Sequence, residues 1–155
     1  MSVLDYFKRF GITTGAAAAA AAKAATITLV KGVAPSSVTI PTPVGLRLEV
    51  LIERIFIDND RVCADVRKIA GDNPDSLNNA VIRACVRSIN EQVIRIVGGR
   101  GVGRVMRPGL SIPMGEYAIS PTAKFMIENA VREVINAGIE VVIEVPNGEE
   151  LAKLR

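Results

Sequence analysis

Histidine and tryptophan are both absent from this sequence of 155 residues. Without histidine, the chain cannot build a Ser-His-Asp or Cys-His catalytic system, a histidine-ligated metal site or a histidine proton shuttle. Its two cysteines, Cys63 and Cys85, are too few for a zinc site or a disulfide scaffold and are typical of a reduced cytoplasmic protein. We expect both to be core residues on strands, so any chemistry must use carboxylates, hydroxyls, backbone amides and cations.

Long hydrophobic runs are also missing, because no segment approaches the ~18 consecutive apolar residues of a membrane-spanning helix. Lys8 and Arg9 followed by the alanine run 16–22 superficially resemble a secretory signal. Alanine is only weakly apolar, however, and the glycines and threonines of 11–15 interrupt the segment. Hydrophobic residues make up 49% of the chain, which excludes intrinsic disorder. We therefore expect a folded cytoplasmic protein without a membrane partner, and we leave open whether it forms a homo-oligomer.

Positive charge is carried mainly by arginine, with thirteen arginines against six lysines, and the net charge is +3. Arg83–Arg107 contains six arginines and one acid, whereas Glu116–Glu150 contains seven acids and two cations. This asymmetry is typical either of solvated faces or of a face that binds anions. One interpretation is therefore a non-catalytic module that binds anions or nucleic acid through Arg83–Arg107. Aromatic residues make up only 4% of the chain, so few side chains could stack on bases, and we expect no nucleic-acid partner.

The order of the periodic segments predicts an α+β fold, a two-layer sandwich of a mostly antiparallel sheet with two main helices on one face. Residues 1–145 would form this domain, and 146–155 would begin a helix that leads to a missing second half. Helical periodicity, N-caps and glycine stops predict the helices at 16–30 and 121–135. Alternating β-branched residues predict the strands at 38–40, 47–57, 61–68 and 139–145, and a hairpin of 80–88 with 92–97.

Three segments could bind a ligand. The loop after residue 97 places Arg100, Arg104 and Arg107 among Gly99, Gly101 and Gly103, so that guanidinium groups and amides could meet carboxylates; a plain series of turns is the alternative. Thr13, Thr14 and Gly15 stand at a helix start that could attract an anion, and the alanine face beyond them would leave room for a bulky ligand. The alternative there is an ordinary cap with tightly packed alanines.

The third segment is the turn that contains Asp72 and Asp75. These two carboxylates could act as a base or serve only as turn residues.

Four blocks in order resemble the CbiD family, the cobalt-precorrin-5B (C(1))-methyltransferases of anaerobic cobalamin biosynthesis. The blocks are Gly11-Ile-Thr-Thr-Gly15, Ala70-Gly-Asp-Asn-Pro-Asp75, Gly101–Leu110 with Ile119-Ser-Pro121, and Val145–Ala152. The family usually has a cysteine shortly after the Thr-Thr-Gly, where this chain has alanine. Family members also continue beyond the last block, so the chain resembles their N-terminal part.

The resemblance implies that S-adenosylmethionine donates a methyl group to a ring carbon of a cobalt-containing tetrapyrrole. Such a transfer depends mainly on the alignment of two bound reactants, and the cobalt belongs to the substrate, so no protein-bound metal is expected. The acetate and propionate arms of the substrate would bind Arg100, Arg104, Arg107 and Lys124. Thr13, Thr14 and Gly15 would form an amide-lined pocket beside them, and Asp72 and Asp75 would orient a reactant or accept a proton. The location of the S-adenosylmethionine pocket is not predicted, and a purely structural role for this part of the chain is a third possibility.

Overall fold

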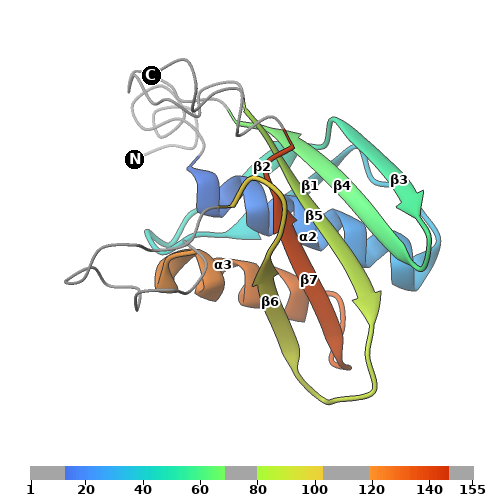
Figure 1. Cartoon of the computed structure of the whole chain (residues 1–155). Helices are drawn as coiled ribbons and strands as arrows, with labels where there is room; N and C mark the ends of the chain where they lie inside the picture. Colours follow the sequence, from blue (N-terminus) through green and yellow to red (C-terminus); the bar gives the residue numbers. More distant parts are fainter. Residues whose placement is uncertain (1–12, 69–79, 103–118, 147–155) are drawn as a thin grey trace.

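The computed structural model describes residues 13–68, 80–102 and 119–146. Five strands form one sheet in the order β3-β4-β5-β7-β6, antiparallel throughout except for the parallel pair β6–β7, and β1 and β2 form a separate antiparallel hairpin. Both helices lie on the same side of the five-stranded sheet (Figure 1), which confirms the predicted α+β class. The elements are α2 (Thr14–Lys31), β1 (Ser37–Pro41), β2 (Arg47–Leu51), β3 (Arg54–Asp58), β4 (Arg61–Arg67), β5 (Val81–Ser88), β6 (Ile94–Gly98), α3 (Pro121–Arg132) and β7 (Ile139–Glu144).

Helix α2 begins and ends close to the predicted positions. Thr13 is the N-cap, and its Oγ accepts a hydrogen bond of 3.0 Å from the amide of Ala16. The helix ends at Gly32, which adopts a left-handed φ of 70° and donates its amide to the carbonyl of Thr28. Helix capping by threonine and left-handed termination by glycine are both local effects, so the sequence predicts them well.

The alanines of α2 are packed inside the protein. They are at most 3% exposed, because the helix contacts β4 and β5 on one side, the hairpin through β1 on another, and α3 on a third. Small side chains around the whole circumference let three neighbours approach the helix backbone. The expectation that these alanines leave room for a bulky ligand is therefore wrong, and the tight packing that was its alternative is confirmed.

Two predictions about the strands are wrong. Arg47–Ile57 is two strands in two sheets: Ile52 still donates its amide to Ser36 of the hairpin, whereas Glu53 donates to Asp65 of the larger sheet. The hairpin of 80–88 with 92–97 does not form, because β7 lies between β5 and β6. The local turn signal at residues 90–91 is real, but pairing with the distant β7 separates the two strands.

The expectation of two reduced cysteines is also wrong. Cys63 and Cys85 face each other across β4 and β5 and are joined by a disulfide. Both residues are fully buried, so their predicted place in the interior is confirmed. The pairing depends on strand register, which the spacing of the cysteines in the sequence does not reveal. Among the described residues, no helix is long and apolar enough to cross a membrane.

Candidate functional site

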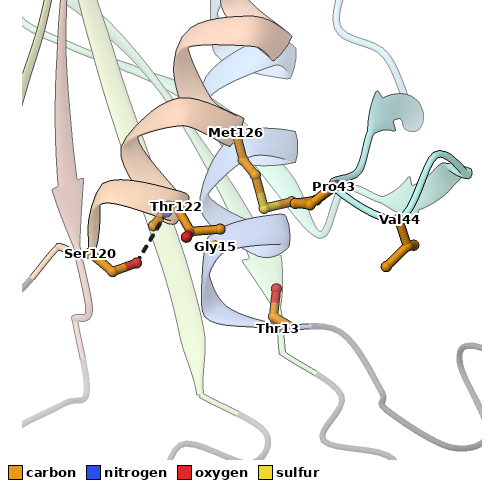
Figure 2. A pocket seen from close by; sticks show the side chains of 8 residues that line it. Thr13, Gly15, Pro43, Val44, Ser120, Thr122 and Met126 are labelled. Atoms are coloured by element: carbon orange, nitrogen blue, oxygen red, sulfur yellow. Dashed lines mark hydrogen bonds between the residues drawn. The ribbon is translucent and has the colours of Figure 1, made fainter. Parts of the chain in front are cut away.

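The two helices begin side by side at one end of the molecule. Ser120 caps α3, and its Oγ accepts a hydrogen bond of 3.1 Å from the amide of Ala123, just as Thr13 caps α2. Gly15 favours the close approach, because a Cβ at this position would make a tight contact of 3.3 Å with the Cα of Ala123. Figure 2 shows both helix starts at the same end of the parallel pair. The fold thus brings two segments together that lie more than a hundred residues apart.

A cavity of about 250 Å³ opens between these helix starts and the turn of the β1–β2 hairpin. Its polar groups are the hydroxyls of Thr13, Ser120 and Thr122. Across from them, Figure 2 shows Pro43 of the turn close to the side chain of Met126. We call this cavity the helix-start pocket; it is lined by Thr13, Gly15, Pro43, Val44, Ser120, Thr122, Ala123 and Met126.

The helix-start pocket has an apolar wall and lies at two helix starts, whose first turns carry backbone hydrogen-bond donors. The amides of Thr14, Gly15 and Thr122 lie in first helical turns, where no acceptor exists within the helix. Two helix N-termini also place partial positive charge at the same end. The arrangement suits a carboxylate or another anionic group that is attached to an apolar body.

An ion-pair network fixes the hairpin that forms the opposite wall. Glu133, at the end of α3, accepts from Lys23 Nζ of α2 at 2.9 Å and from both Arg47 Nη1 and Arg47 Nη2 of β2 at 2.9 Å. The Lys23 ammonium also donates to the carbonyl of Thr39 on β1 at 2.7 Å. Hydrogen bonding from Arg47, supported by Lys23, lowers the pKa of Glu133 to about 2. The network therefore ties the hairpin to both helices with a carboxylate that stays ionised.

The structure brings some predicted site residues together and separates others. Thr13 and Gly15 line the helix-start pocket, and Thr14 is the first residue of α2 but is not among the lining residues. Lys124 follows the lining residue Ala123 on α3. Its partly exposed side chain could reach an anion outside the pocket. The predicted residues Asp72, Asp75, Gly103, Arg104 and Arg107 lie outside the described residues.

The glycine-rich segment is placed elsewhere, at the end of β6. A Cβ at Gly101 would lie 2.0 Å from the carbonyl oxygen of Val145, and one at Gly99 would lie 2.8 Å from Val142. Both glycines are thus required by packing against β7 and its continuation. Arg100 between them is exposed, and its carbonyl accepts from the amide of Val145. Neither the glycines nor Arg100 line the helix-start pocket.

Sequence reasoning missed most of the pocket lining. Ser120-Pro121 was recognisable as a helix start, and two Ser/Thr caps before two helices are the signal that could have suggested a shared site. Nothing in the sequence indicated that the hairpin turn would cover them. The missed residues are Pro43, Val44, Ser120, Thr122, Ala123 and Met126.

Comparison with known proteins identifies the family. The family model described as CbiD matches residues 3–154 of this chain. The chain belongs to the CbiD family. It is 58% identical over 150 residues to the cobalt-precorrin-5B C(1)-methyltransferase of Pyrobaculum aerophilum and 55% identical over 151 residues to that of Saccharolobus solfataricus. Each alignment covers 97% of this CbiD chain and 43% of the relative.

A solved structure supports the same family at the level of the fold. The CbiD chain is similar to the crystal structure of a cobalamin biosynthesis protein (cbiD) from Archaeoglobus fulgidus, with a TM-score of 0.67 and 39% sequence identity. The alignment covers 94% of this chain and 46% of that one. The CbiD chain thus spans less than half the length of these relatives.

Proposed function

We propose that this CbiD chain takes part in the S-adenosylmethionine-dependent methylation of a ring carbon of cobalt-precorrin in cobalamin biosynthesis. The observation that carries the proposal is 58% identity, over 97% of the chain, to a protein named cobalt-precorrin-5B C(1)-methyltransferase.

The helix-start pocket is our candidate for the binding of a carboxylate-bearing ligand. Pockets that enclose a whole drug-sized ligand usually measure about 300–1,000 Å³, so a cavity of about 250 Å³ suits one end of a larger molecule. Both reactants have such an end: S-adenosylmethionine carries an amino-acid carboxylate, and the tetrapyrrole carries acetate and propionate arms. The amides of Thr14, Gly15 and Thr122 would bind the carboxylate, and Met126 and Pro43 would contact the attached apolar part.

The chemistry needs alignment more than it needs a reactive side chain. S-adenosylmethionine supplies an electrophilic methyl group: when the ring carbon attacks the methyl carbon, the bond from that carbon to sulfur breaks and the sulfonium leaves as a neutral thioether. In our proposal Arg100, together with Arg104, Arg107 and Lys124, binds peripheral carboxylates of the tetrapyrrole, and Asp72 or Asp75 orients a reactant or accepts a proton. Holding both reactants in this way supplies the proximity that dominates such a transfer. Among the described residues, no group of His, Cys, Asp and Glu side chains could hold a metal ion.

The alternative of a nucleic-acid-binding module has less support. Three arginines of the basic segment that the structure describes are engaged by acids: Arg83 by Asp65 at 2.7 Å, Arg87 by Glu140 at 2.9 Å, and Arg95 by Glu91. The positive charge of these three arginines is therefore balanced locally in the folded protein. A phosphate backbone would have to displace these acids before it could bind.

Isothermal titration calorimetry on the CbiD chain tests the proposed site. S-adenosylmethionine and cobyrinic acid, a cobalt corrinoid with free carboxylate arms, are titrated separately. Val44 is 63% exposed on the rim of the pocket, so it tolerates a charged side chain. We expect Val44→Glu to weaken the binding of the ligand that places its carboxylate in the pocket by roughly fivefold, because like charges repel at short range.

The matched variant Val44→Lys adds the same bulk with the opposite charge and is expected to bind that ligand as well as the wild type or better. The ligand that responds to the sign of the charge is the one that occupies the helix-start pocket. Equal weakening by both variants would assign the effect to bulk and would refute the anion site. No binding of either ligand to the wild type would refute the proposed function for this chain.

A further inference from the structure

The disulfide lies in the middle of an apolar row on the face of the sheet opposite the helices. Strand register aligns Phe56 of β3, Cys63 of β4, Cys85 of β5 and Val142 of β7 across this face. Among the described residues, both helices pack against the other face (Figure 1). Even so, both cysteines are 0% exposed. Something other than a helix must therefore cover them.

Charged residues flank the row on either side. Since side chains alternate along a strand, residues two positions from each member of the row point to the same face. They make two rows of charges, one with Asp65, Arg83 and Glu144 and the other with Arg61, Arg87 and Glu140. Long arginine side chains lay their apolar stems along such a surface and keep the charged group in water.

One ion pair crosses the apolar row from one charged row to the other. Arg61 Nη2 lies 3.7 Å from Glu144 Oε1, and the same guanidinium nitrogen binds Asp58 at 3.0 Å. The Glu144 oxygen that faces Arg61 also lies 3.6 Å from the sulfur of Cys85. A carboxylate is therefore held directly against the disulfide, between its sulfur and the approach from solvent.

We propose that Cys63 and Cys85 form a reversible thiol–disulfide site for a dithiol reductant, and that the Arg61–Glu144 ion pair limits the rate of exchange. The reductant's thiolate attacks one sulfur, the protein S–S bond breaks, and the other cysteine leaves as a thiolate. The reductant's second thiolate then attacks the reductant's own sulfur in the mixed disulfide, and the first cysteine leaves as a thiolate. The protein thus gains two electrons and the reductant becomes a cyclic disulfide. The Glu144 carboxylate opposes this reaction twice, since it repels the incoming thiolate and disfavours a developing thiolate on Cys85.

Alkylation by iodoacetamide followed by mass spectrometry tests the proposal on the whole chain. Protein purified without reductant is expected to take up no label even in urea. With dithiothreitol in excess, the rate of labelling should rise in proportion to its concentration. Glu144→Gln removes the charge beside the sulfur and is expected to accelerate reduction by roughly five- to tenfold.

The matched control is Glu140→Gln, on the same strand and face, because its carboxylate pairs with Arg87 and Arg95, whereas the oxygen 3.6 Å from the Cys85 sulfur belongs to Glu144. It should leave the rate within about twofold of the wild type. Glu144→Asp, which keeps the charge but shortens the side chain, should give an intermediate rate and serves if Glu144→Gln does not fold. The urea concentration at which each variant is half unfolded is also measured. Faster reduction without a lower urea midpoint indicates direct attack on the folded protein, whereas faster reduction with a lower midpoint indicates attack after global unfolding.

Three results would overturn the proposal. The first is free thiols in the wild type isolated without reductant, and the second is equal reduction rates for Glu144→Gln and the wild type. The third is acceleration by Glu140→Gln that matches that of Glu144→Gln. Acceleration confined to the Glu144 variants would support it.

Discussion

Glu133 should stabilise the fold through its charge, and the effect should depend on pH. Its carboxylate joins Lys23 of α2 to Arg47 of β2, and its pKa falls from an ordinary value of 4.5 to about 2. One pKa unit corresponds to about 1.4 kcal/mol, so the full shift would be worth roughly 3 kcal/mol. Because a third of the Glu133 side chain is exposed, solvent screening reduces this to about 1–2 kcal/mol.

The sign follows from the direction of the shift. A carboxyl whose pKa is lower in the folded state than in the unfolded state stabilises the fold above the unfolded value. This contribution is complete above about pH 5 and is lost as the pH falls from 4.5 toward 2. Glu133→Gln should therefore lower the free energy of unfolding at pH 7 by about 1–2 kcal/mol, and the difference from the wild type should shrink toward zero at pH 2.

Urea unfolding followed by circular dichroism at pH 7, 5, 3 and 2 measures this difference. Glu128→Gln is the matched control, since Glu128 stands on the same helix and pairs with Arg132 at 3.3 Å, with both side chains nearly half exposed. It should cost no more than about 0.5 kcal/mol at pH 7. A difference between Glu133→Gln and the wild type that is the same at pH 7 and pH 2 would refute the electrostatic reasoning.

Two further predictions concern backbone conformation and helix capping. Gly101→Ala should destabilise the protein by at least about 2 kcal/mol, because its φ is +79° and its Cβ would collide with the carbonyl oxygen of Val145; Gly45→Ala, with a φ of +84° but open space around it, should cost only about 1 kcal/mol. Equal thermal shifts for the two variants would contradict the packing argument. Thr13→Ala and Ser120→Ala should each cost about 1 kcal/mol in urea unfolding, since each removes the acceptor of a first-turn amide. A loss below about 0.3 kcal/mol at either position would show that the cap is dispensable.

Features that depend on neighbouring residues were predictable. The N-cap Thr13, the stop at Gly32 and the start of α3 at Ser120-Pro121 all follow from local hydrogen bonding and backbone conformation. Alternating burial along β7 likewise follows from the pattern of its own side chains. The sequence was therefore enough to predict these elements, the α+β class and the helix caps Thr13 and Ser120, which both line the helix-start pocket.

Features that depend on distant residues were not predictable in the same way. The position of β7 between β5 and β6 is decided by pairing over some fifty residues, against a plausible local hairpin signal. The alanines of α2 are buried because the β1–β2 hairpin and α3 pack against the helix in addition to the sheet, which no periodicity shows. The same hairpin brings Pro43 and Val44 to the pocket, so two of its eight lining residues depended on a contact that the sequence does not display.

The most direct test of the proposed site is the backbone amide spectrum of the nitrogen-15-labelled chain during titration with S-adenosylmethionine and with cobyrinic acid. If a carboxylate binds at the two helix starts, the amide signals of Thr14, Gly15 and Thr122 should shift together and saturate at the same ligand concentration, and Val44→Glu should move that concentration upward. Saturable shifts confined to other parts of the chain, or no saturable shift with either ligand, would contradict the account.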